Sequence, residues 1–560
     1  MTDGRRRKGR RGQAQGGAAP RGNAPRPRAL VIPRIWILVL LALILAFVAV
    51  VRLRLLNTPL ERDEGEYAYA GQLILQGVPP YQLAYNMKLP GTYGAYALIL
   101  ALFGQSAIAV HLGLLLVNAA TILLVFALGR RLFGNLAGIA AAAGYAILSI
   151  TPSVYGTAAH ATHFVVLPAL AGAYLLLLAG ERNKGWLYVS SGVLLGLAFV
   201  MKQHGAVFVL FGLLYLLIAR WRSGLQQVLR PMALLGGGAA LPFALTCLIL
   251  LGAGVFQRFW FWTFSYAREY VSEAPLASAW STFATEFAAV AAPTKLLWLL
   301  GAIGAAAIAR DRGRRPQMLF IGLFLACSAL GVCVGFYFRP HYFILVLPAV
   351  AILIGAAVGT LAEFLASRRF PAAAAFGLPA LLLALALAPT LAAEGRPLFQ
   401  LTPDQFSRET YGNNPFLEAR EIGRYLTEHA APDARIAVVG SEPEIYFYSR
   451  RKSATGFIYT YALMEEQPFA RQMQEQMIAE IEKARPEYLV FVNVPTSWVP
   501  REHSERLLIT WYQRYAPEHY DLVGVVDLLP DESVYRWGAE APTYALRSPA
   551  NVYVLKRRAA

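Results

Sequence analysis

Long apolar runs, separated by short polar stretches, fill the chain from Trp36 to about Ala392. A helix needs about 20 apolar residues to cross the hydrocarbon core of a bilayer. We therefore expect about eleven transmembrane helices, the first of them uncleaved. They lie near residues 35–55, 107–128, 134–152, 162–179, 185–201, 205–219, 231–254, 294–309, 317–337, 341–363 and 370–392. Together these runs predict a polytopic α-helical membrane domain over residues 35–392.

Basic loops alternate with less basic loops along the chain, and this alternation predicts how the helices are oriented in the membrane. Short loops rich in Lys and Arg mark the cytoplasmic side of a membrane protein. The basic residues of every second loop are Arg130, Arg131, Arg182, Lys184, Arg220, Arg222, Arg230, Arg310, Arg312, Arg314, Arg315, Arg368 and Arg369. The tail, residues 1–34, is basic and of low complexity, so we expect it to be disordered and cytoplasmic. An odd number of spans then places residues 393–560 outside the cytoplasm, on a multi-pass protein of the cell inner (plasma) membrane.

Charge and cysteine content exclude several other classes of protein. The formal net charge is +17, but the basic residues lie mainly in the tail and the short loops. They act as topology signals, and we expect no nucleic-acid partner because no basic stripe interleaved with aromatics is present. The cysteines are Cys247, Cys327 and Cys333, all within apolar runs. Their positions predict neither a disulfide framework nor a zinc site.

Ionisable residues near the membrane gather on the predicted outer side. Such residues are costly at a bilayer and are functional candidates by default. The long first outer loop, residues 56–106, carries three of them, and the second, third and fifth outer segments carry the rest. They are Asp63, Glu64, Lys88, His160, His163, Lys202, His204, Arg339 and His341, with Tyr342 beside the last.

Each of these residues also allows a structural interpretation. Asp63 precedes a predicted surface helix that ends at Gly77, so it is either a general base or the N-cap of that helix. Lys88 and Arg339 suit phosphate oxygens, but also suit anchoring at the membrane interface. His160 and His163 share one helical face, yet no third ligand follows on their segment. We therefore predict that they contact substrate and that no metal is required.

Two motifs give the chain a resemblance to a known superfamily. Residues 62–67 read Arg-Asp-Glu-Gly-Glu-Tyr, and residues 88–91 read Lys-Leu-Pro-Gly. In this order and topology the chain resembles the GT-C glycosyltransferases. Its motifs are most similar to those of the bacterial relatives of protein O-mannosyltransferases and aminoarabinose transferases, of the family 39 or 83 type. These have an Asp-Glu pair in a long first outer loop with two surface helices, followed by a Lys-Pro-Pro-like element.

The likeness covers most of residues 35–392. The late segment Arg-Pro-His-Tyr at residues 339–342, with the Leu-Val-Leu-Pro-Ala that follows at 345–349, resembles the late element of the same families. Two departures concern the site. Many relatives carry a carboxylate in the second outer loop, where this chain has His160 and His163. Gly91 replaces the second proline of the lysine element.

The resemblance implies transfer of a hexose or pentose from a polyprenyl-phosphate donor to a hydroxyl on a glycan, lipid or protein, with inversion. Asp63 is then the general base, and Glu64 orients the acceptor or tunes Asp63. Lys88 and Arg339 bind the donor phosphate, and His160, His163, Lys202, His204, His341 and Tyr342 contact substrate. A lipid-linked donor needs no further cofactor. The alternatives are a secondary transporter, which usually shows inverted repeats and midplane polar residues, and a non-catalytic membrane assembly protein.

Residues 393–560 predict a small extracytoplasmic α/β domain. Strand-like runs occupy residues 436–439, 488–492 and 523–526, and helical stretches occupy 464–484 and 502–515. Alternation of strands and helices is typical of α/β folds. No catalytic triad or phosphate loop is evident there, and we expect this domain to bind the acceptor or to cover the cleft.

Overall fold

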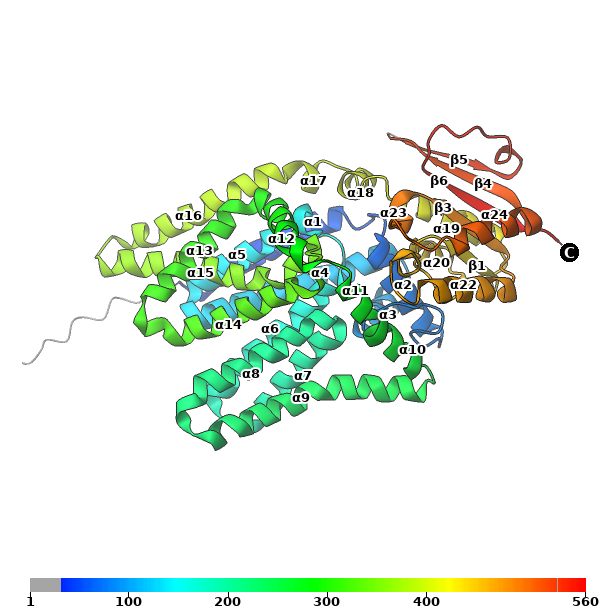
Figure 1. Ribbon diagram of the computed structural model, residues 1–560. Coiled ribbons are helices and arrows are strands. Elements are labelled where there is room, and N and C mark those ends of the chain that lie inside the picture. Colours follow the sequence, from blue (N-terminus) through cyan, green and yellow to red (C-terminus); the bar gives the residue numbers. More distant parts are fainter. Residues whose placement is uncertain (1–31, 531, 560) are drawn as a thin grey trace, which may run out of the picture.

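The computed structural model describes residues 32–530 and 532–559. It consists of a long helical bundle joined at one end to a smaller α/β part (Figure 1). The predictions for the tail, residues 1–34, fall almost entirely outside the described residues.

Every predicted apolar run forms a helix. Nine helical segments of the described chain are long and apolar enough to cross a membrane, and the shorter apolar helices α5 and α7 occupy the remaining predicted spans. The chain is thus a polytopic membrane protein. The bundle helices are α1 (Arg34–Arg54), α4 (Ala107–Phe133), α5 (Asn135–Leu148), α6 (Ala161–Arg182), α7 (Gly185–Met201), α8 (Ala206–Arg220), α9 (Leu225–Gly252), α13 (Lys295–Arg310), α14 (Arg315–Val332), α15 (Leu347–Ser367) and α16 (Ala372–Ala393).

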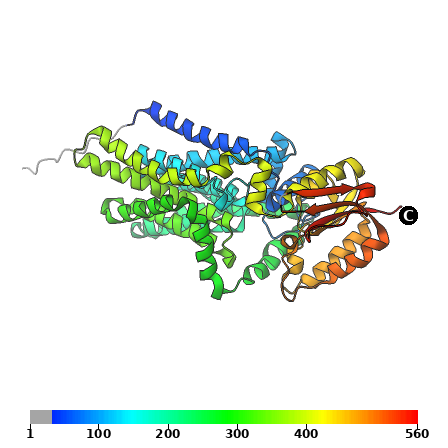
Figure 2. The same cartoon turned by 90° about the horizontal axis from the view of Figure 1, so that it is seen from above.

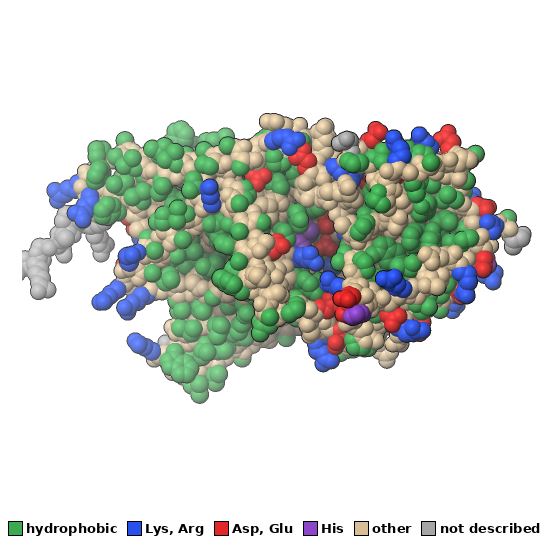
Figure 3. All heavy atoms as spheres, turned by 45° about the horizontal axis from the view of Figure 1, so that its top comes forward, with side chains coloured by type: hydrophobic (Ala, Val, Ile, Leu, Met, Phe, Trp, Pro, Cys, Tyr) green, Lys and Arg blue, Asp and Glu red, His purple; other side chains and the backbone are tan. Residues whose placement is uncertain are grey.

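Small residues let the bundle helices approach closely. A Cβ atom at Gly355 of α15 would lie 2.2 Å from the carbonyl oxygen of Ala137 in α5. Membrane helices depend on such close backbone approach because lipid provides little hydrophobic drive for their association. The short basic loops all lie at the end of the bundle opposite the α/β part, where Figure 3 shows clustered Lys and Arg.

The segment between α14 and α15 differs from the prediction, which had spans at 317–337 and 341–363. Helix α14 ends at Val332 and α15 begins only at Leu347, with 3-10 turns η7 (Val334–Phe336) and η8 (Pro340–Leu345) between them. Positive φ angles at Gly335 (74°) and Phe338 (45°) end the helical path. The polar residues 339–342 therefore lie on a longer outer segment than the sequence indicates.

The outer segments form short helices at the opposite end from the basic loops. The first contains α2 (Arg62–Leu75) and α3 (Gly91–Phe103), and the second contains η1 (Pro152–Val154). The third contains η2 (Gln203–Gly205). The fourth contains α10 (Phe256–Trp260), the π-helical turn η4 (Phe261–Tyr266), α11 (Ala267–Ser272), α12 (Leu276–Ala291) and η5 (Ala292–Thr294).

Helix α2, which the sequence predicts as a surface helix, is covered by other parts of the protein. Its residues from Glu64 to Leu73 are all buried, and Gly77 follows its end with a φ of 76°. The α/β part packs directly on it, since a Cβ atom at Gly65 would lie 2.6 Å from the Cβ of Glu444. The sequence could not show this cover, because it comes from almost 400 residues further along the chain.

The C-terminal part confirms the predicted α/β architecture. A sheet of six strands has the order β2-β1-β3-β6-β4-β5, with β6 antiparallel to both of its neighbours. Its strands are β1 (Arg435–Val439), β2 (Lys452–Ser453), β3 (Tyr488–Asn493), β4 (Tyr520–Leu528), β5 (Ser533–Trp537) and β6 (Asn551–Arg557). Its helices are α17 (Gly395–Phe399), α18 (Pro403–Tyr411), α19 (Phe416–His429), α20 (Glu444–Ser449), α21 (Tyr461–Met464), α22 (Ala470–Ala484), α23 (Pro495–Trp498), α24 (Leu507–His519) and the 3-10 turn η9 (Gly538–Glu540).

Helices cover both faces of this sheet (Figure 2). Ile436 and Val438 of β1 pack with residues of α19 and α20, whereas Ala437 and Val439 pack with α22 and α24. This follows from the two-residue period of a strand. The α19–α20 side shares one hydrophobic core with α2 and α3 of the first outer segment, so the two parts of the protein are joined by a continuous apolar interface.

Candidate active site

Several of the polar residues predicted to be functional meet where helix α2 begins, between the bundle and the α/β part. Figure 3 looks into a hollow at this boundary, in which acidic, basic and histidine side chains lie together. The first outer segment supplies the carboxylates and Lys88, and the second, third and fifth outer segments supply the histidines and the other cations.

The N-terminus of α2 leaves Asp63 free for other contacts. Glu61 is the N-cap: its carboxylate accepts the Glu64 amide, and the Glu64 carboxylate accepts the Glu61 amide in return. Such a capping box satisfies the first amides of a helix. The alternative interpretation of Asp63 as the N-cap is therefore wrong.

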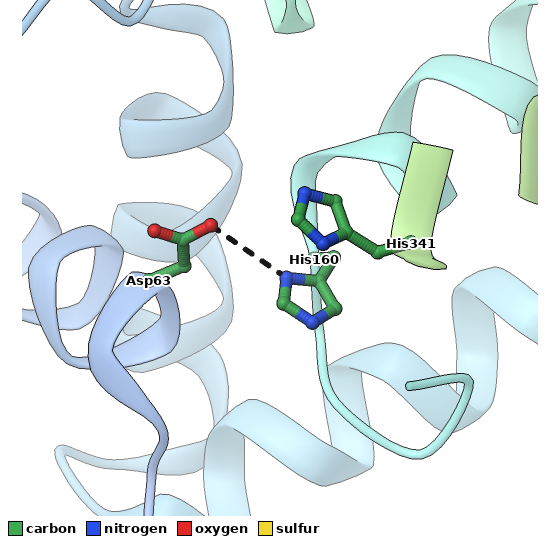
Figure 4. Close-up of side chains that lie close together, drawn as sticks. All are labelled: Asp63, His160 and His341. Atoms are coloured by element: carbon green, nitrogen blue, oxygen red, sulfur yellow. Dashed lines mark ion pairs between the residues drawn. The ribbon is translucent and has the colours of Figure 1, made fainter. Parts of the chain in front are cut away.

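The Asp63 carboxylate faces three groups from three different segments. Its Oδ1 accepts a 2.7 Å hydrogen bond from Lys88 Nζ, and Tyr459 Oη also donates to Oδ1 at 3.4 Å. Its Oδ2 lies 3.8 Å from Nδ1 of His160 (Figure 4). Oδ1 is thus engaged twice, and Oδ2 is the more open oxygen.

Charge around Asp63 holds it in the ionised state. Burial raises the pKa of its carboxyl, but the neighbouring Lys88 and His160 outweigh that effect and hold the pKa well below its usual range. The pKa of His160 is raised in return, because Glu61 and Asp63 outweigh its burial. Burial raises the pKa of Glu61 to about 7. The site therefore combines an ionised aspartate with one carboxyl, that of Glu61, whose pKa lies at about 7.

Lys88 also binds a second carboxylate, Glu66, which our sequence analysis did not assign to the site. The Nζ–Oε2 distance is 2.5 Å, and Glu66 is fully buried. Tyr93 donates to its other oxygen at 2.5 Å. Residues three apart on a helix share a face. The spacing from Asp63 to Glu66 therefore indicates, in the sequence itself, that both carboxylates lie on the same side of α2.

Glu64 is a buried anchor at the edge of the site. Its side chain is 2% exposed, and its Oε1 accepts the backbone amide of Ala159 at 2.6 Å. His111 Nε2 lies 3.2 Å from the same oxygen. Glu64 thereby ties α2 to α4 and to the segment that leads directly into His160.

His160 and His341 come from distant segments and stack on each other. Their ring centroids are 4.2 Å apart at an interplanar angle of 11°. With Asp63 they offer three ligand atoms within 4.8 Å of one another, a set that could hold a metal ion (Figure 4). The segment of His160 offers one ligand to this set. The other two ligands, Asp63 and His341, come from other segments. His163 is buried within α6 and does not join this group.

A second contact group contains Lys202, His204 and Tyr342. The Lys202 Nζ lies 4.2 Å from the centroid of the Tyr342 ring, and His204 packs on the same ring at 4.6 Å. Arg339 is exposed and lies over Tyr337, 5.5 Å from its centroid. Tyr342 directly follows His341 and so connects this group to the histidine stack.

The α/β part contributes residues that the sequence did not single out. Arg62, next to Asp63, donates to the Ser441 carbonyl at 2.6 Å and pairs with Glu442 at 3.1 Å. Tyr459 Oη donates to the Arg62 carbonyl at 2.9 Å, and its ring lies 5.5 Å from Lys88 Nζ. No local motif indicates Tyr459, because its role depends on contact with residues almost 400 positions earlier.

One family model and several solved structures are similar to this chain. A family model described as dolichyl-phosphate-mannose-protein mannosyltransferase matches residues 90–250, from the start of α3 to the end of α9. This is less than a third of the chain. A search of curated protein sequences finds no match.

Solved structures match over almost the whole chain. ArnT from Cupriavidus metallidurans, bound to undecaprenyl phosphate, has 16% identity and a TM-score of 0.56, and the match covers 94% of this chain and 98% of that one. The oligosaccharyltransferase AglB from Archaeoglobus fulgidus, with an inhibitory peptide and a dolichol-phosphate, has 13% identity and a TM-score of 0.53. That match covers 90% of this chain and 74% of AglB.

Proposed function

We propose that this chain, which has the GT-C fold, is a membrane glycosyltransferase that moves a sugar from a polyprenyl-phosphate carrier to an acceptor hydroxyl. The observation that carries the proposal is the ionised Asp63 at the end of the bundle, with Lys88 of the first outer segment and His160 of the second lying against its carboxylate. The matched structures support the donor class, since ArnT is bound to undecaprenyl phosphate and AglB to a dolichol-phosphate.

Asp63 is proposed as the general base of a direct displacement. The acceptor oxygen attacks the anomeric carbon, and the bond from that carbon to the phosphate oxygen breaks, leaving the electron pair on the phosphate. Asp63 Oδ2 takes the acceptor proton, because Oδ1 is held by Lys88 and Tyr459. Attack opposite the leaving group inverts the anomeric carbon. A base must lie within hydrogen-bond reach of the proton it takes, and Oδ2 is the oxygen with room for an acceptor.

Positive charge near Asp63 is proposed to stabilise the leaving phosphate. Fixed charges aimed at a developing anion lower the barrier without reorganising during the reaction. Lys88, Lys202 and Arg339 provide this charge from the first, third and fifth outer segments. Glu64, with its carboxylate fully engaged, is proposed to act indirectly by positioning Asp63 and His160.

The site is proposed to face the extracytoplasmic side of the plasma membrane. The basic loops lie at the opposite end of the bundle, as the positive-inside rule requires for that orientation. The N-terminus is then cytoplasmic and the α/β part lies outside. The α/β part covers the site and supplies Tyr459, and an acceptor (glycan, lipid or protein) would enter beside it.

A transporter fits the arrangement less well. Transporters bind substrate near the bilayer midplane, at the interface between structural repeats. Here the ionisable cluster lies at one end of the bundle, under the α/β part. That position suits chemistry on a lipid phosphate at the membrane surface.

The proposal is tested by transfer with the purified full-length chain. The protein is incubated with a panel of undecaprenyl-phosphate hexoses and pentoses and an envelope extract as acceptor, and release of undecaprenyl phosphate is followed. We expect release with one donor class, and its loss in Asp63→Asn. Asp521→Asn, which removes a carboxylate of an exposed ion pair with Arg558 in the α/β part, is the matched control. Full activity in Asp63→Asn would eliminate the proposed base.

A further inference from the structure

A half-buried tyrosine has a strained backbone conformation beside the proposed base. Tyr155 directly follows the turn η1 with a φ of 51°, in the left-handed region that residues with a Cβ atom seldom adopt. Its ring centroid lies 6.1 Å from that of His160, whose Nδ1 faces Asp63 Oδ2. Strain of this kind persists only where the surroundings impose it, and it gathers at functional sites. Tyr155 is therefore a candidate for a binding role, which the proposed displacement does not yet assign.

A buried arginine holds the turn that carries Tyr155. Arg52 lies near the end of helix α1 and is 4% exposed. It donates to the carbonyl of Gly156 at 3.0 Å and to that of Ser149 at 3.3 Å, and its Nε donates to Asn118 at 3.4 Å. Within the described part of the chain, no acidic side chain forms an ion pair with it. An arginine buried in a membrane helix is costly, and here its hydrogen bonds serve to position the turn.

A second half-buried tyrosine, from the C-terminal part, faces the first. Tyr411 is the last residue of helix α18, and its ring centroid lies 5.4 Å from that of Tyr155 at an interplanar angle of 43°. The side chain of Asn414 fixes the turn that follows: it donates to the Tyr411 carbonyl at 2.7 Å and accepts from Arg62 at 3.1 Å. Because Arg62 directly precedes Asp63, this pair of rings has a fixed position relative to the proposed base.

The tyrosine pair, Tyr155 and Tyr411, has the chemistry of a carbohydrate subsite. Neither hydroxyl has a hydrogen-bond partner among the residues that the structure describes, so both can bind the hydroxyls of a sugar. Aromatic faces carry partial negative charge, and a sugar ring presents on its face C–H bonds that pack against them. Binding sites for small molecules combine apolar walls of this kind with a few polar groups that fix orientation.

The surroundings of the tyrosine pair fit a glycan better than a peptide or a lipid. Gly412 and Asn413, which follow Tyr411, are exposed, so the rim beside the pair is polar, whereas a lipid would need an apolar rim. An extended peptide commonly adds to the edge of a sheet. The pair is carried by a 3-10 turn and by the end of a helix, neither of which offers a strand edge.

We propose that the acceptor is a glycan, and that a sugar ring of this glycan binds on the tyrosine pair with one hydroxyl directed at Asp63 Oδ2. This inference rests on the proposed function and names the acceptor class within it. The imidazole of His160 lies beside Tyr155 and faces Oδ2, so the bound sugar lies along it. Lys88 engages the other oxygen, Oδ1, which leaves the Oδ2 side to the acceptor.

Acceptor use by the purified full-length protein tests the inference. The envelope extract is separated into a polysaccharide fraction freed of lipid and protein, a protein fraction and a lipid fraction, and transfer from the active undecaprenyl-phosphate sugar to each fraction is measured. We expect transfer to the polysaccharide fraction.

Kinetics of variants then test the tyrosine pair itself. Tyr411→Leu and Tyr155→Leu should each raise KM for the polysaccharide about tenfold or more, because they remove an aromatic face, and should leave KM for the donor within about twofold. Phenylalanine at either position keeps the ring and should raise the polysaccharide KM less than about fivefold, as loss of a neutral hydrogen bond would. Tyr553→Leu, which removes a half-buried tyrosine of strand β6, is the matched control.

Two results would overturn the inference. One is transfer to the protein or lipid fraction and none to the polysaccharide, and the other is an unchanged polysaccharide KM in a leucine variant. Either result, combined with donor-dependent transfer that Asp63→Asn abolishes, removes the glycan subsite and leaves the proposed function standing. If the wild-type protein releases undecaprenyl phosphate with no fraction, the proposed function fails as well. Thermal unfolding midpoints identify a misfolded variant, and since the two tyrosines lie on different elements, the other leucine variant then decides.

Discussion

The hydroxyl of Tyr459 in the α/β part donates to the backbone carbonyl of Arg62, 2.9 Å away, at the first turn of helix α2. The same hydroxyl reaches Asp63 Oδ1 at 3.4 Å. Since α2 belongs to the first outer segment, this contact crosses between the two parts of the protein. It makes the α/β part a wall of the candidate active site, and not merely an attached domain.

Tyr459→Phe should lower kcat about five- to tenfold with little change in KM for the donor. The variant keeps the ring that faces Lys88 but loses the hydroxyl, whose single proton lies between the Arg62 carbonyl and Asp63 Oδ1. That hydrogen bond is worth about 1 kcal/mol, so Asp63 is held less firmly. Steady-state kinetics with the active donor measure the effect. Tyr512→Phe, whose ring stacks on Phe491 within the α/β part, should behave like the wild type. An unchanged kcat in Tyr459→Phe would show that the contact has no catalytic consequence.

Glu64→Ala should destabilise the fold by about 3 kcal/mol, because it leaves the buried Ala159 amide without its partner and breaks the contact to His111. Activity should fall with it, since the segment bearing His160 is released. The unfolding midpoint in detergent measures the loss. Glu428→Ala removes an exposed carboxylate of α19 and should shift the midpoint by less than a degree or two. A stable but inactive Glu64→Ala protein would instead indicate a direct catalytic role.

Gly91→Ala should impair transfer at least tenfold, because its methyl group would lie 2.5 Å from the Val200 carbonyl and would separate Lys88 from Lys202. Gly94→Ala lies one turn later on the same helix, where a Cβ atom meets nothing within 4 Å, and it should retain full activity. Transfer rates of the two variants, measured side by side, make the comparison. Equal rates would mean that the spacing of the two segments does not matter.

The specificity constant kcat/KM for the donor should fall as the pH rises through about 7. Burial lowers the pKa of Lys202 to about 7, with Asp63 raising it and Lys88 lowering it, while His204 and Tyr342 pack around it. Below that pH Lys202 is charged and binds the phosphate, and above it the charge is lost. In Lys202→Arg this alkaline decline should move to much higher pH, since arginine stays charged. A decline near pH 7 that persists in Lys202→Arg would assign it to another group.

Removal of divalent cations should leave transfer intact. Lys202 and Arg339 are proposed to supply the charge that a metal would provide, although Asp63, His160 and His341 form a set that could hold one. Activity after dialysis against a chelator should match the untreated enzyme within about twofold. A loss of activity that Mg²⁺, Mn²⁺ or Zn²⁺ restores would replace this expectation with a metal-dependent mechanism.

Apolar runs predicted the membrane helices well. The length of a run decides whether it can span a bilayer, and this property is local to the sequence. The predicted strands at residues 436–439 and 488–492 were equally local, because β1 and β3 are short continuous apolar runs, and almost all of their residues are buried. The ends of α14 and α15 were missed, since backbone turns at Gly335 and Phe338 interrupt an apolar stretch without changing its polarity.

The sequence by itself determined the membrane helices and the set of polar residues at one end of them. Only the tertiary structure decided which of these residues act together. Lys88 and Lys202 look equivalent in the sequence, yet one is bound by Asp63 and Glu66 and the other has no described acidic partner. Charge pairing depends on distances between segments far apart along the chain, and those distances arise only when the helices and the α/β part pack together.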